Sequence, residues 1–251
     1  MAKLSIDELK KLQETTAKEL RKEGRTDLLV CGGTGCHATG SIKVIDTLRE
    51  EIREKNLEDS VRIVETGCNG FCAMGPVMVV QPGGIFYQKI KADDIPELIE
   101  SQVINKTPLE RLLHKDPISK KRIAVQEEIP FFANQLSRAL RNKGIINPES
   151  INDYIARQGY LGAAKALTEI SPEHIIEEIK TSGLRGRGGA GFPTGIKWGF
   201  ARASRSDIKY VLCNADEGDP GAFMDRSILE ADPHAVVEGM IIAAKAIDSH
   251  K

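Results

Sequence analysis

The hydrophobic pattern of the first 105 residues switches between helical and strand periodicity. Apolar residues three or four apart, with charges between them, predict helices over residues 6–23, 41–55 and 93–103. The first of these begins with a capping-box pattern, Ser5 followed by Glu8. Short aliphatic and β-branched runs predict strands at residues 27–31, 61–65, 77–81 and 85–87. The order α-β-α-β-β-α predicts a complete small α/β domain over residues 1–105.

The rest of the chain has a weaker pattern. Residues 106–150 carry mixed charge and scattered prolines, and we interpret them as a connector with helices, the clearest at 131–143. Residues 151–251 form a further region. Its pattern predicts helices and one strand, at residues 153–169, 172–180, 208–213 (the strand) and 233–247. The final helix is apolar on nearly every side, so we expect it to be buried.

Composition limits the possible functions. The 251 residues contain 35 Lys and Arg against 36 Asp and Glu, a formal charge of −1. This balance argues against a nucleic-acid binder driven by bulk electrostatics and against a polybasic membrane-surface protein. No apolar run approaches the roughly 20 residues that span a bilayer, and the first residues lack the apolar segment of a signal peptide. We therefore expect a cytoplasmic protein without a transmembrane segment.

Cysteine placement is the first chemical signal. Four of the five cysteines lie in the first 72 residues, as the pairs Cys31-x4-Cys36 and Cys68-x3-Cys72, and each pair follows a predicted strand. Both segments are rich in glycine, which lets backbone N–H groups approach anionic sulfur closely. A two-iron cluster held by four thiolates needs such donors, because buried negative charge is otherwise unfavourable. The pattern therefore favours a [2Fe–2S] cluster.

Two other interpretations of the cysteines stay open at this stage. One is structural zinc, for which C-x3-C is an unusual spacing. The other is a set of unliganded core cysteines. His37 follows Cys36, but a Rieske centre needs two histidines, so we interpret His37 as a plain loop residue. The spacing resembles that of the thioredoxin-like [2Fe–2S] ferredoxins over about residues 1–105, which implies that family's fold and the four cysteines as iron ligands.

A second motif lies between Gly183 and Gly199, where glycine is densest. Such a loop can bring its backbone against a phosphate, and Arg185, Arg187 and Lys197 add positive charge. It is not a Walker A sequence, and a helix precedes it where a dinucleotide fingerprint has a strand. Taken alone, it is either a nucleotide-binding loop or a flexible hinge.

An acidic loop follows the predicted strand at 208–213. Within ten residues it carries four acids: Asp216, Glu217, Asp219 and Asp225. A magnesium site and a solvated acidic turn are the simple interpretations of this composition. We interpret the nearby Cys213 as a packed strand residue, Trp198 as a core residue and His234 as a residue of a first helical turn.

The glycine and acidic loops together resemble the FMN- and NADH-binding flavoprotein subunit of respiratory complex I. They resemble still more the β subunit of NAD-linked, electron-bifurcating iron hydrogenases, in which a thioredoxin-like [2Fe–2S] domain precedes the flavoprotein domain. The resemblance implies the N-terminal part of an FMN-binding α/β domain over residues 151–251. In the family this domain continues, with further iron–sulfur domains, beyond the position of Lys251, so we expect only the N-terminal portion here.

The resemblance also implies roles for individual residues. Three glycines and Lys197 would contact FMN, Phe192 and Phe200 would stack on adenine, and the acidic loop would bind flavin and nicotinamide. The cofactor-binding set is Gly186, Arg187, Gly188, Gly189, Ala190, Gly191, Phe192, Lys197, Phe200, Asn214, Asp216, Glu217 and Asp219. Asp219 stands where complex I has a glutamate, which leaves the choice between NAD and NADP open. No side chain is required as a catalyst, because the cofactor carries hydride transfer.

The implied function is an oxidoreductase subunit that passes electrons from NAD(P)H through FMN to iron–sulfur clusters. Its implied partners are an iron-hydrogenase catalytic subunit and a small [2Fe–2S] subunit, with ferredoxin as a further candidate. One alternative is a truncated, non-enzymatic [2Fe–2S] electron carrier or assembly module. Another is the flavoprotein subunit of NADH-quinone oxidoreductase or of an NAD-linked formate dehydrogenase.

Overall fold

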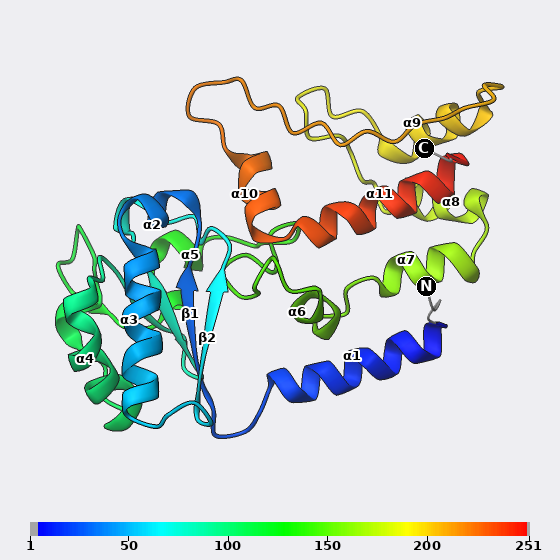
Figure 1. Cartoon of the computed structure of the whole chain (residues 1–251). Helices are drawn as coiled ribbons and strands as arrows, with labels where there is room; N and C mark the ends of the chain where they lie inside the picture. The colour runs from blue at the N-terminus through cyan, green and yellow to red at the C-terminus, as the bar shows by residue number, and fades with distance from the viewer. Residues whose placement is uncertain (1–4, 250–251) are drawn as a thin grey trace. The chain divides into compact units, whose positions relative to one another are not determined.

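The computed structural model describes residues 5–249, which form two compact units (Figure 1). The first unit, called here the sheet unit, comprises residues 18–153 and 217–232. The second, called here the helical unit, comprises the described residues up to 17, residues 154–216, and those from 233 onward. Each unit is therefore assembled from separate stretches of the chain.

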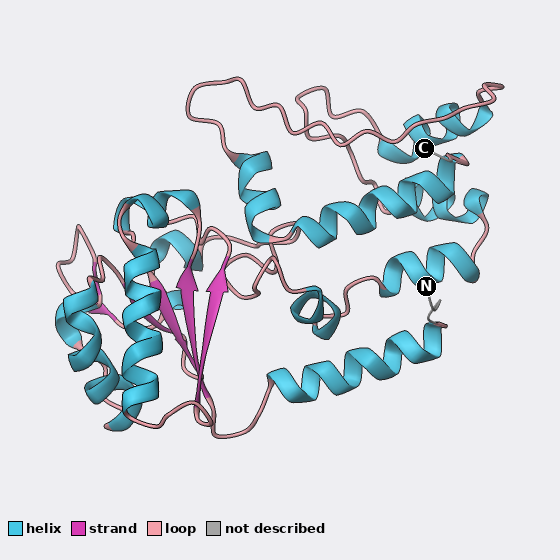
Figure 2. Cartoon of the chain, in the orientation of Figure 1, coloured by secondary structure: helices cyan, strands magenta, loops and turns pink. Residues whose placement is uncertain are grey.

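The sheet unit is built on four strands, shown in magenta in Figure 2. They are β1 (Thr26–Cys31), β2 (Val61–Thr66), β3 (Met78–Gln81) and β4 (Ile85–Tyr87). Their spatial order is β2-β1-β3-β4, with β1 parallel to β2 and antiparallel to β3, and with β3 and β4 joined as a hairpin. All four predicted strands and the α/β class are confirmed.

Strand β1 is buried on both faces, which explains its continuous run of apolar residues. Leu28 and Val30 face one core together with Val44 and Leu48 of helix α3 (Ser41–Glu54). The alternate residues Leu29 and Cys31 belong to the opposite core. The predicted closing helix is also present, as α4 (Ile95–Leu98) continued by a π-helical turn, Ile99–Ile104.

The connector packs on the sheet. Ile129 is fully buried against Leu29, Val79 and Phe86, and bridges from Leu113 and Val125 extend the β4 edge. A short hairpin, β5 (His114–Lys115) and β6 (Arg122–Ile123), lies between those two bridges. These residues therefore complete the second face of the sheet.

The helix predicted over residues 131–143 is wrong, because only α5 (Pro130–Ala133) forms. The Asn134 side chain donates to the Pro130 carbonyl at 2.9 Å, and that of Gln135 to the Phe131 carbonyl at 2.6 Å. These side-chain amides take the carbonyls that a continuing helix would need for its backbone N–H groups.

The helical unit contains most of the remaining helices. They are α1 (Ile6–Leu20, which passes into the sheet unit), α6 (Ile151–Ala156, which begins in it), α7 (Leu161–Thr168), α8 (Pro172–Thr181), α9 (Thr194–Ala203) and α11 (Pro233–Ile247). The capping box of α1 is present, since the Ser5 and Glu8 backbone N–H groups each donate to the other residue's side chain. Helices α7, α8, α9 and α11 pack around Ile175, Ile176 and Ala246.

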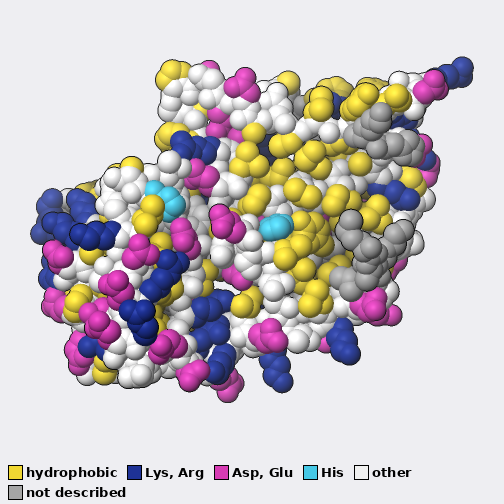
Figure 3. All heavy atoms as spheres, viewed as in Figure 1, with side chains coloured by type: hydrophobic (Ala, Val, Ile, Leu, Met, Phe, Trp, Pro, Cys, Tyr) yellow, Lys and Arg dark blue, Asp and Glu magenta, His cyan; other side chains and the backbone are white. Residues whose placement is uncertain are grey.

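Three predictions for this region are corrected. The helix expected at 153–169 breaks between α6 and α7, where Gln158 and Tyr160 have positive φ angles. Residues 208–213 form no strand, and Leu212 is 85% exposed, because they have no strand to pair with in the described chain. Helix α11 is mostly half-buried, with only Glu238, Ala246 and Ile247 buried. Figure 3 shows hydrophobic side chains gathered at the surface over α11 and its neighbours.

Candidate functional site

The two cysteine pairs meet at one end of the sheet. Cys31 is the last residue of β1 and pairs in register with Thr66, the last residue of β2. Because β1 and β2 are parallel, the segments that follow them leave from the same edge. Cys68 lies in the segment after β2, and Cys72 begins a 3₁₀ turn, Cys72–Met74. The topology therefore brings together the four cysteines predicted as ligands.

Cys36 occupies a helix that the sequence did not reveal. It lies on α2 (Thr34–Ala38), whose N-cap is Gly33. The helix begins within three residues of β1, so Cys36 turns back toward Cys31. His37, the next residue, contacts Glu65 through an Nε2–Oε1 distance of 3.3 Å.

The four thiols form one connected group. The Cys68 and Cys72 Sγ atoms are 3.9 Å apart, and Cys31 lies close enough to Cys36 and Cys68 for these thiols to shift its pKa. Three of the thiols are buried, and Cys72 is exposed. Between residues 5 and 249, no group of three or more His, Cys, Asp or Glu side chains is placed to hold a single metal ion.

Backbone N–H groups point at the sulfur atoms. The Asn69 N–H donates to Cys31 Sγ at 3.3 Å, and the backbone N–H groups of Gly70 and Val77 act to lower the pKa values of Cys68 and Cys36. These donors supply the charge compensation that a buried cluster of thiolates needs. The chemistry of this group, four thiols with backbone N–H groups beside them, fits a [2Fe–2S] cluster.

Glycines make this close packing possible. A Cβ atom at Gly33 would lie 2.8 Å from the Cβ of Cys68, and one at Gly75 would lie 2.9 Å from Cys36 Sγ. Gly70 has a φ angle of +90°, a backbone conformation that favours glycine. Side chains at Gly33 and Gly75 would collide with Cys68 and Cys36, so these two glycines belong to the site.

The neighbouring thiols shift one another's pKa values in opposite directions. A hydrogen bond with Cys36 raises the pKa of Cys31 to about 11, and a hydrogen bond with Cys31, with burial, raises that of Cys68. Burial raises the pKa of Cys72, whereas the hydrogen bond with Cys31 lowers that of Cys36. Ligation of iron by these thiols therefore requires the release of protons.

Helix α10 (Met224–Ala231) lies against this group within the sheet unit. A Cβ atom at Gly67 would lie 2.1 Å from the Glu230 carbonyl oxygen and 2.4 Å from the Ala231 Cα. The Asn142 Nδ2 atom donates to Asp232 Oδ2, just after the helix, at 2.6 Å. This contact could not be predicted from local sequence patterns, because its partners are far apart in the chain.

The glycine loop is exposed and precedes α9, and hydrogen bonds within it hold its two ends together. The Gly186 N–H donates to the Phe192 carbonyl at 2.9 Å, and the Arg185 Nε atom donates to the Gly191 carbonyl at 2.6 Å. No atom outside the immediate chain neighbours lies within 4 Å of a Cβ built at Gly188 or Gly189. The loop backbone is therefore open to a ligand, as a nucleotide-binding loop requires.

The other predicted flavin residues are distributed over both units. Phe192, Lys197 and Phe200 are exposed around the start of α9, and Phe200 is 68% exposed. The Asn214 Oδ1 atom accepts from the Asp216 N–H at 3.0 Å. Glu217 and Asp219 belong to the sheet unit, whereas the others belong to the helical unit.

Glu217 has a structural role that the sequence did not predict. Its carboxylate oxygens accept from the backbone N–H groups of Asp225 at 2.8 Å and Arg226 at 3.1 Å, in the first turn of α10. Burial raises the pKa of Glu217, but these backbone bonds outweigh it and leave the pKa below its ordinary value. Cys213, predicted as a packed strand residue, is exposed. Trp198 packs against the core of the helical unit, as predicted.

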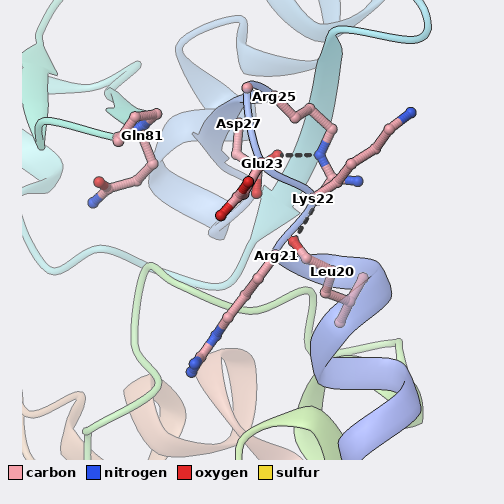
Figure 4. A pocket seen from close by; sticks show the side chains of 9 residues that line it. Leu20, Arg21, Lys22, Glu23, Arg25, Asp27 and Gln81 are labelled. Carbon is pink, nitrogen blue, oxygen red and sulfur yellow. Dashed lines mark hydrogen bonds and ion pairs between the residues drawn. The ribbon is translucent and has the colours of Figure 1, made fainter.

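A shallow cavity of about 340 Å³ lies at the other end of β1 (Figure 4). There Arg25 donates to Asp27 Oδ1 at 2.9 Å and to the Leu20 carbonyl at 2.5 Å. Arg62 donates to the second Asp27 oxygen at 2.8 Å. Because both carboxylate oxygens of Asp27 accept from arginines, we interpret the charged residues of this cavity as a structural ion-pair network.

Two family models match this chain. Residues 16–102 match the thioredoxin-like [2Fe-2S] ferredoxin family, and residues 179–251 match the Nuo51 FMN-binding domain. These descriptions name a [2Fe–2S] cluster and FMN, the two cofactors predicted from the cysteine and glycine motifs. In the described chain, no helix is long and apolar enough to cross a membrane.

Individual relatives give the same division. The NADP-reducing hydrogenase subunit HndC of Solidesulfovibrio fructosivorans is 62% identical over 113 residues, which are 45% of this chain and 23% of HndC. The NAD-reducing hydrogenase HoxS subunit alpha of Cupriavidus necator is 30% identical over 92% of this chain and 36% of its own length. These matched regions therefore span about a quarter and about a third of the curated relatives.

One solved structure is similar to part of this chain. The thioredoxin-like [2Fe-2S] ferredoxin from Aquifex aeolicus is 33% identical over 35% of this chain and 94% of its own, with a TM-score of 0.33. Residues 16–102 are therefore similar to the thioredoxin-like [2Fe–2S] ferredoxins, and residues 179–251 are similar to the Nuo51 FMN-binding domain.

Proposed function

We propose that this chain is the electron-input part of an NAD(P)H oxidoreductase that carries FMN and a [2Fe–2S] cluster. The observation that carries the proposal is the convergence of four thiols and their backbone donors, in a chain that also bears an open glycine loop. FMN, when bound, would supply the exchange between the two-electron hydride chemistry of NAD(P)H and the one-electron chemistry of an iron–sulfur cluster.

The protein's own contribution is binding and orientation. The open backbone of Gly188 and Gly189 would lie against FMN, and Lys197, in the first turns of α9, would face its phosphate or ring. Phe192 and Phe200 are exposed and free to stack on an adenine. Asn214 and Asp216 supply polar groups for flavin and nicotinamide. Cys31, Cys36, Cys68 and Cys72 would hold the cluster.

A direct test is an anaerobic spectrum of the purified chain with iron and flavin assays. We expect about two iron atoms and about one FMN per chain. We also expect the flavin absorbance to bleach after addition of NADH or NADPH. Flavin that is bound and stays unbleached with both nucleotides would contradict the oxidoreductase proposal.

The glycine loop can be tested separately. Gly188→Val places a branched side chain where there is open space, so folding should persist while close approach of FMN is blocked. Gly239→Ala, at an equally open position of the same unit but on α11, is the matched control. FMN affinity should fall at least tenfold for Gly188→Val alone.

The second candidate is a [2Fe–2S] carrier or assembly module without enzymatic activity. The exposure of the glycine loop and the use of Glu217 within the chain favour it. Iron without flavin in the same assay would select this function.

The similarity of this chain to the hydrogenase subunit HndC supports a role within a hydrogenase complex. We propose an iron-hydrogenase catalytic subunit and a small [2Fe–2S] subunit as partners in the cytoplasm, with ferredoxin as a further electron partner. The complex I and formate dehydrogenase alternatives predict different partners. Affinity purification of the chain from its native cell, followed by identification of stoichiometric partners, separates them.

A further inference from the structure

Helix α10 brings residues of the FMN-binding family segment onto the cysteine group. It contacts the segment that carries Cys31 and Cys36, called here the first cysteine segment, through Thr34. The Thr34 Oγ1 atom donates to Glu230 Oε1 at 2.5 Å. It contacts the segment that carries Cys68 and Cys72, called here the second cysteine segment, through Gly67, against which the helix backbone packs. Helix α10 therefore lies beside both cysteine segments.

Two cations lie beside the second cysteine segment. The Lys143 Nζ atom lies 2.6 Å from a Cβ position built on Gly70. In the sequence, Gly70 is two residues from both Cys68 and Cys72. It donates to Ser227 Oγ of α10 at 3.4 Å. The neighbouring Arg226 is ion-paired with Glu230 at 2.8 Å. Lys143 is half-buried, whereas Arg226 is exposed.

The ion pair with Glu230 raises the pKa of Arg226, so this guanidinium stays protonated on α10. The backbone of α10 packs against Gly67, directly before Cys68, which places the cations of this region near the second cysteine pair.

The carboxylates are placed differently. Glu230 contacts Thr34, in the first cysteine segment, and Glu65 packs against Gly32 of the same segment while it contacts His37. Each electron added to a cluster with four thiolate ligands increases its negative charge. Nearby cations stabilise that reduced state, most strongly where water is partly excluded.

We propose that Lys143 and Arg226 are the residues that raise the reduction potential of the [2Fe–2S] cluster, with Ser227 and Glu230 of α10 holding them beside the second cysteine segment. The inference rests on the cluster of the proposed function. It gives α10 an electrostatic role in electron transfer, in addition to its packing against Gly67.

The test is a redox titration of the cluster, followed by its electron paramagnetic resonance signal. Lys143→Gln and Arg226→Gln should each shift the one-electron equilibrium about threefold toward the oxidised state. The double variant should shift it about tenfold, which is about 59 mV for one electron. Lys143→Arg should keep the original potential, and the shifts should grow at low ionic strength.

Two controls remove equal charge elsewhere. Arg49→Gln removes a paired arginine of α3 that is 59% exposed, compared with 53% for Arg226. Lys55→Gln removes the lysine that directly follows α3. This lysine lies about 20 Å along the helix axis from Ser41, the first residue of α3. Both should leave the potential unchanged.

Unchanged potentials in the double variant, or equal shifts in the controls, would overturn the inference while the cluster assignment stands. A purified chain without iron would instead contradict the proposed function itself. Iron content and the cluster's visible spectrum, measured on every variant, keep these outcomes separate.

Discussion

Thr34 and Glu230 are 196 positions apart in the chain, yet the Thr34 hydroxyl donates to the Glu230 carboxylate at 2.5 Å. Thr34 begins the short helix that carries Cys36, and Glu230 lies in the last turn of α10. The bond joins a residue of the ferredoxin family segment to one of the FMN-binding family segment. The cysteine group is therefore completed by residues from both family segments.

A substitution at Gly67 should disrupt this arrangement. In Gly67→Ala the new Cβ would meet the Glu230 carbonyl oxygen and the Ala231 Cα, which are backbone atoms and cannot rotate away. Overpacking of this kind typically lowers the free energy of unfolding by about 1–3 kcal/mol. Denaturant unfolding measures it. Gly218→Ala, at a position with nothing within 4 Å, should have little effect, and equal losses in both variants would contradict the contact.

Cys68→Ser should abolish the electron paramagnetic resonance signal of the reduced cluster or change it strongly. Cys68 contacts both Cys31 and Cys72, so its loss leaves an incomplete ligand set. Cys213→Ser is the matched control, because Cys213 is exposed and lies outside the thiol group. If the Cys68→Ser signal matched that of the unaltered chain, the iron would have to be bound elsewhere.

His114 should make the sheet unit less stable in mild acid. Burial lowers the pKa of His114, with Asp116 opposing the shift, so the folded chain binds this proton less readily than the unfolded chain. Stability is then complete above the unfolded pKa of about 6.5 and falls as the pH drops through that value. His114→Gln should flatten the decrease between about pH 7 and 5 in urea unfolding, whereas replacement of the exposed His174 should not.

Glu238 should be essential to the helical unit. Its carboxylate accepts from the backbone N–H groups of Tyr160 at 2.9 Å and Ala163 at 3.0 Å, and from the Tyr154 hydroxyl. Glu238→Ala leaves these buried donors without their acceptor, and we expect a loss of about 3 kcal/mol in the free energy of unfolding. Glu177→Ala, on the exposed face of α8, should change stability by less than about 0.5 kcal/mol.

The strands and cysteine positions were predictable because they depend on local periodicity and spacing. Leu28 to Cys31 are apolar without interruption, as a strand buried on both faces requires. The glycines beside the cysteines were likewise visible, since close backbone approach to sulfur has few other solutions.

The remaining features depend on contacts that a local pattern does not contain. Ile208 to Cys213 have strand-like composition, but a strand forms only when a partner is available. The 131–143 segment has helical spacing, yet Asn134 and Gln135 end the helix by bonding its carbonyls. Glu217 was recognised from its motif, but its bonds to α10 follow from tertiary structure.

The interleaved composition of the two units has a consequence for any attempt to divide this protein. The sheet unit needs residues 217–232 as well as 18–153, so the chain passes between the units at several points. No single proteolytic cut releases a unit in one piece, and a fragment that ends at residue 150 keeps every cysteine ligand while it loses α10. Such a fragment would expose Gly67, which α10 covers in the intact chain, and would lack Arg226, so we expect its cluster to have a different reduction potential.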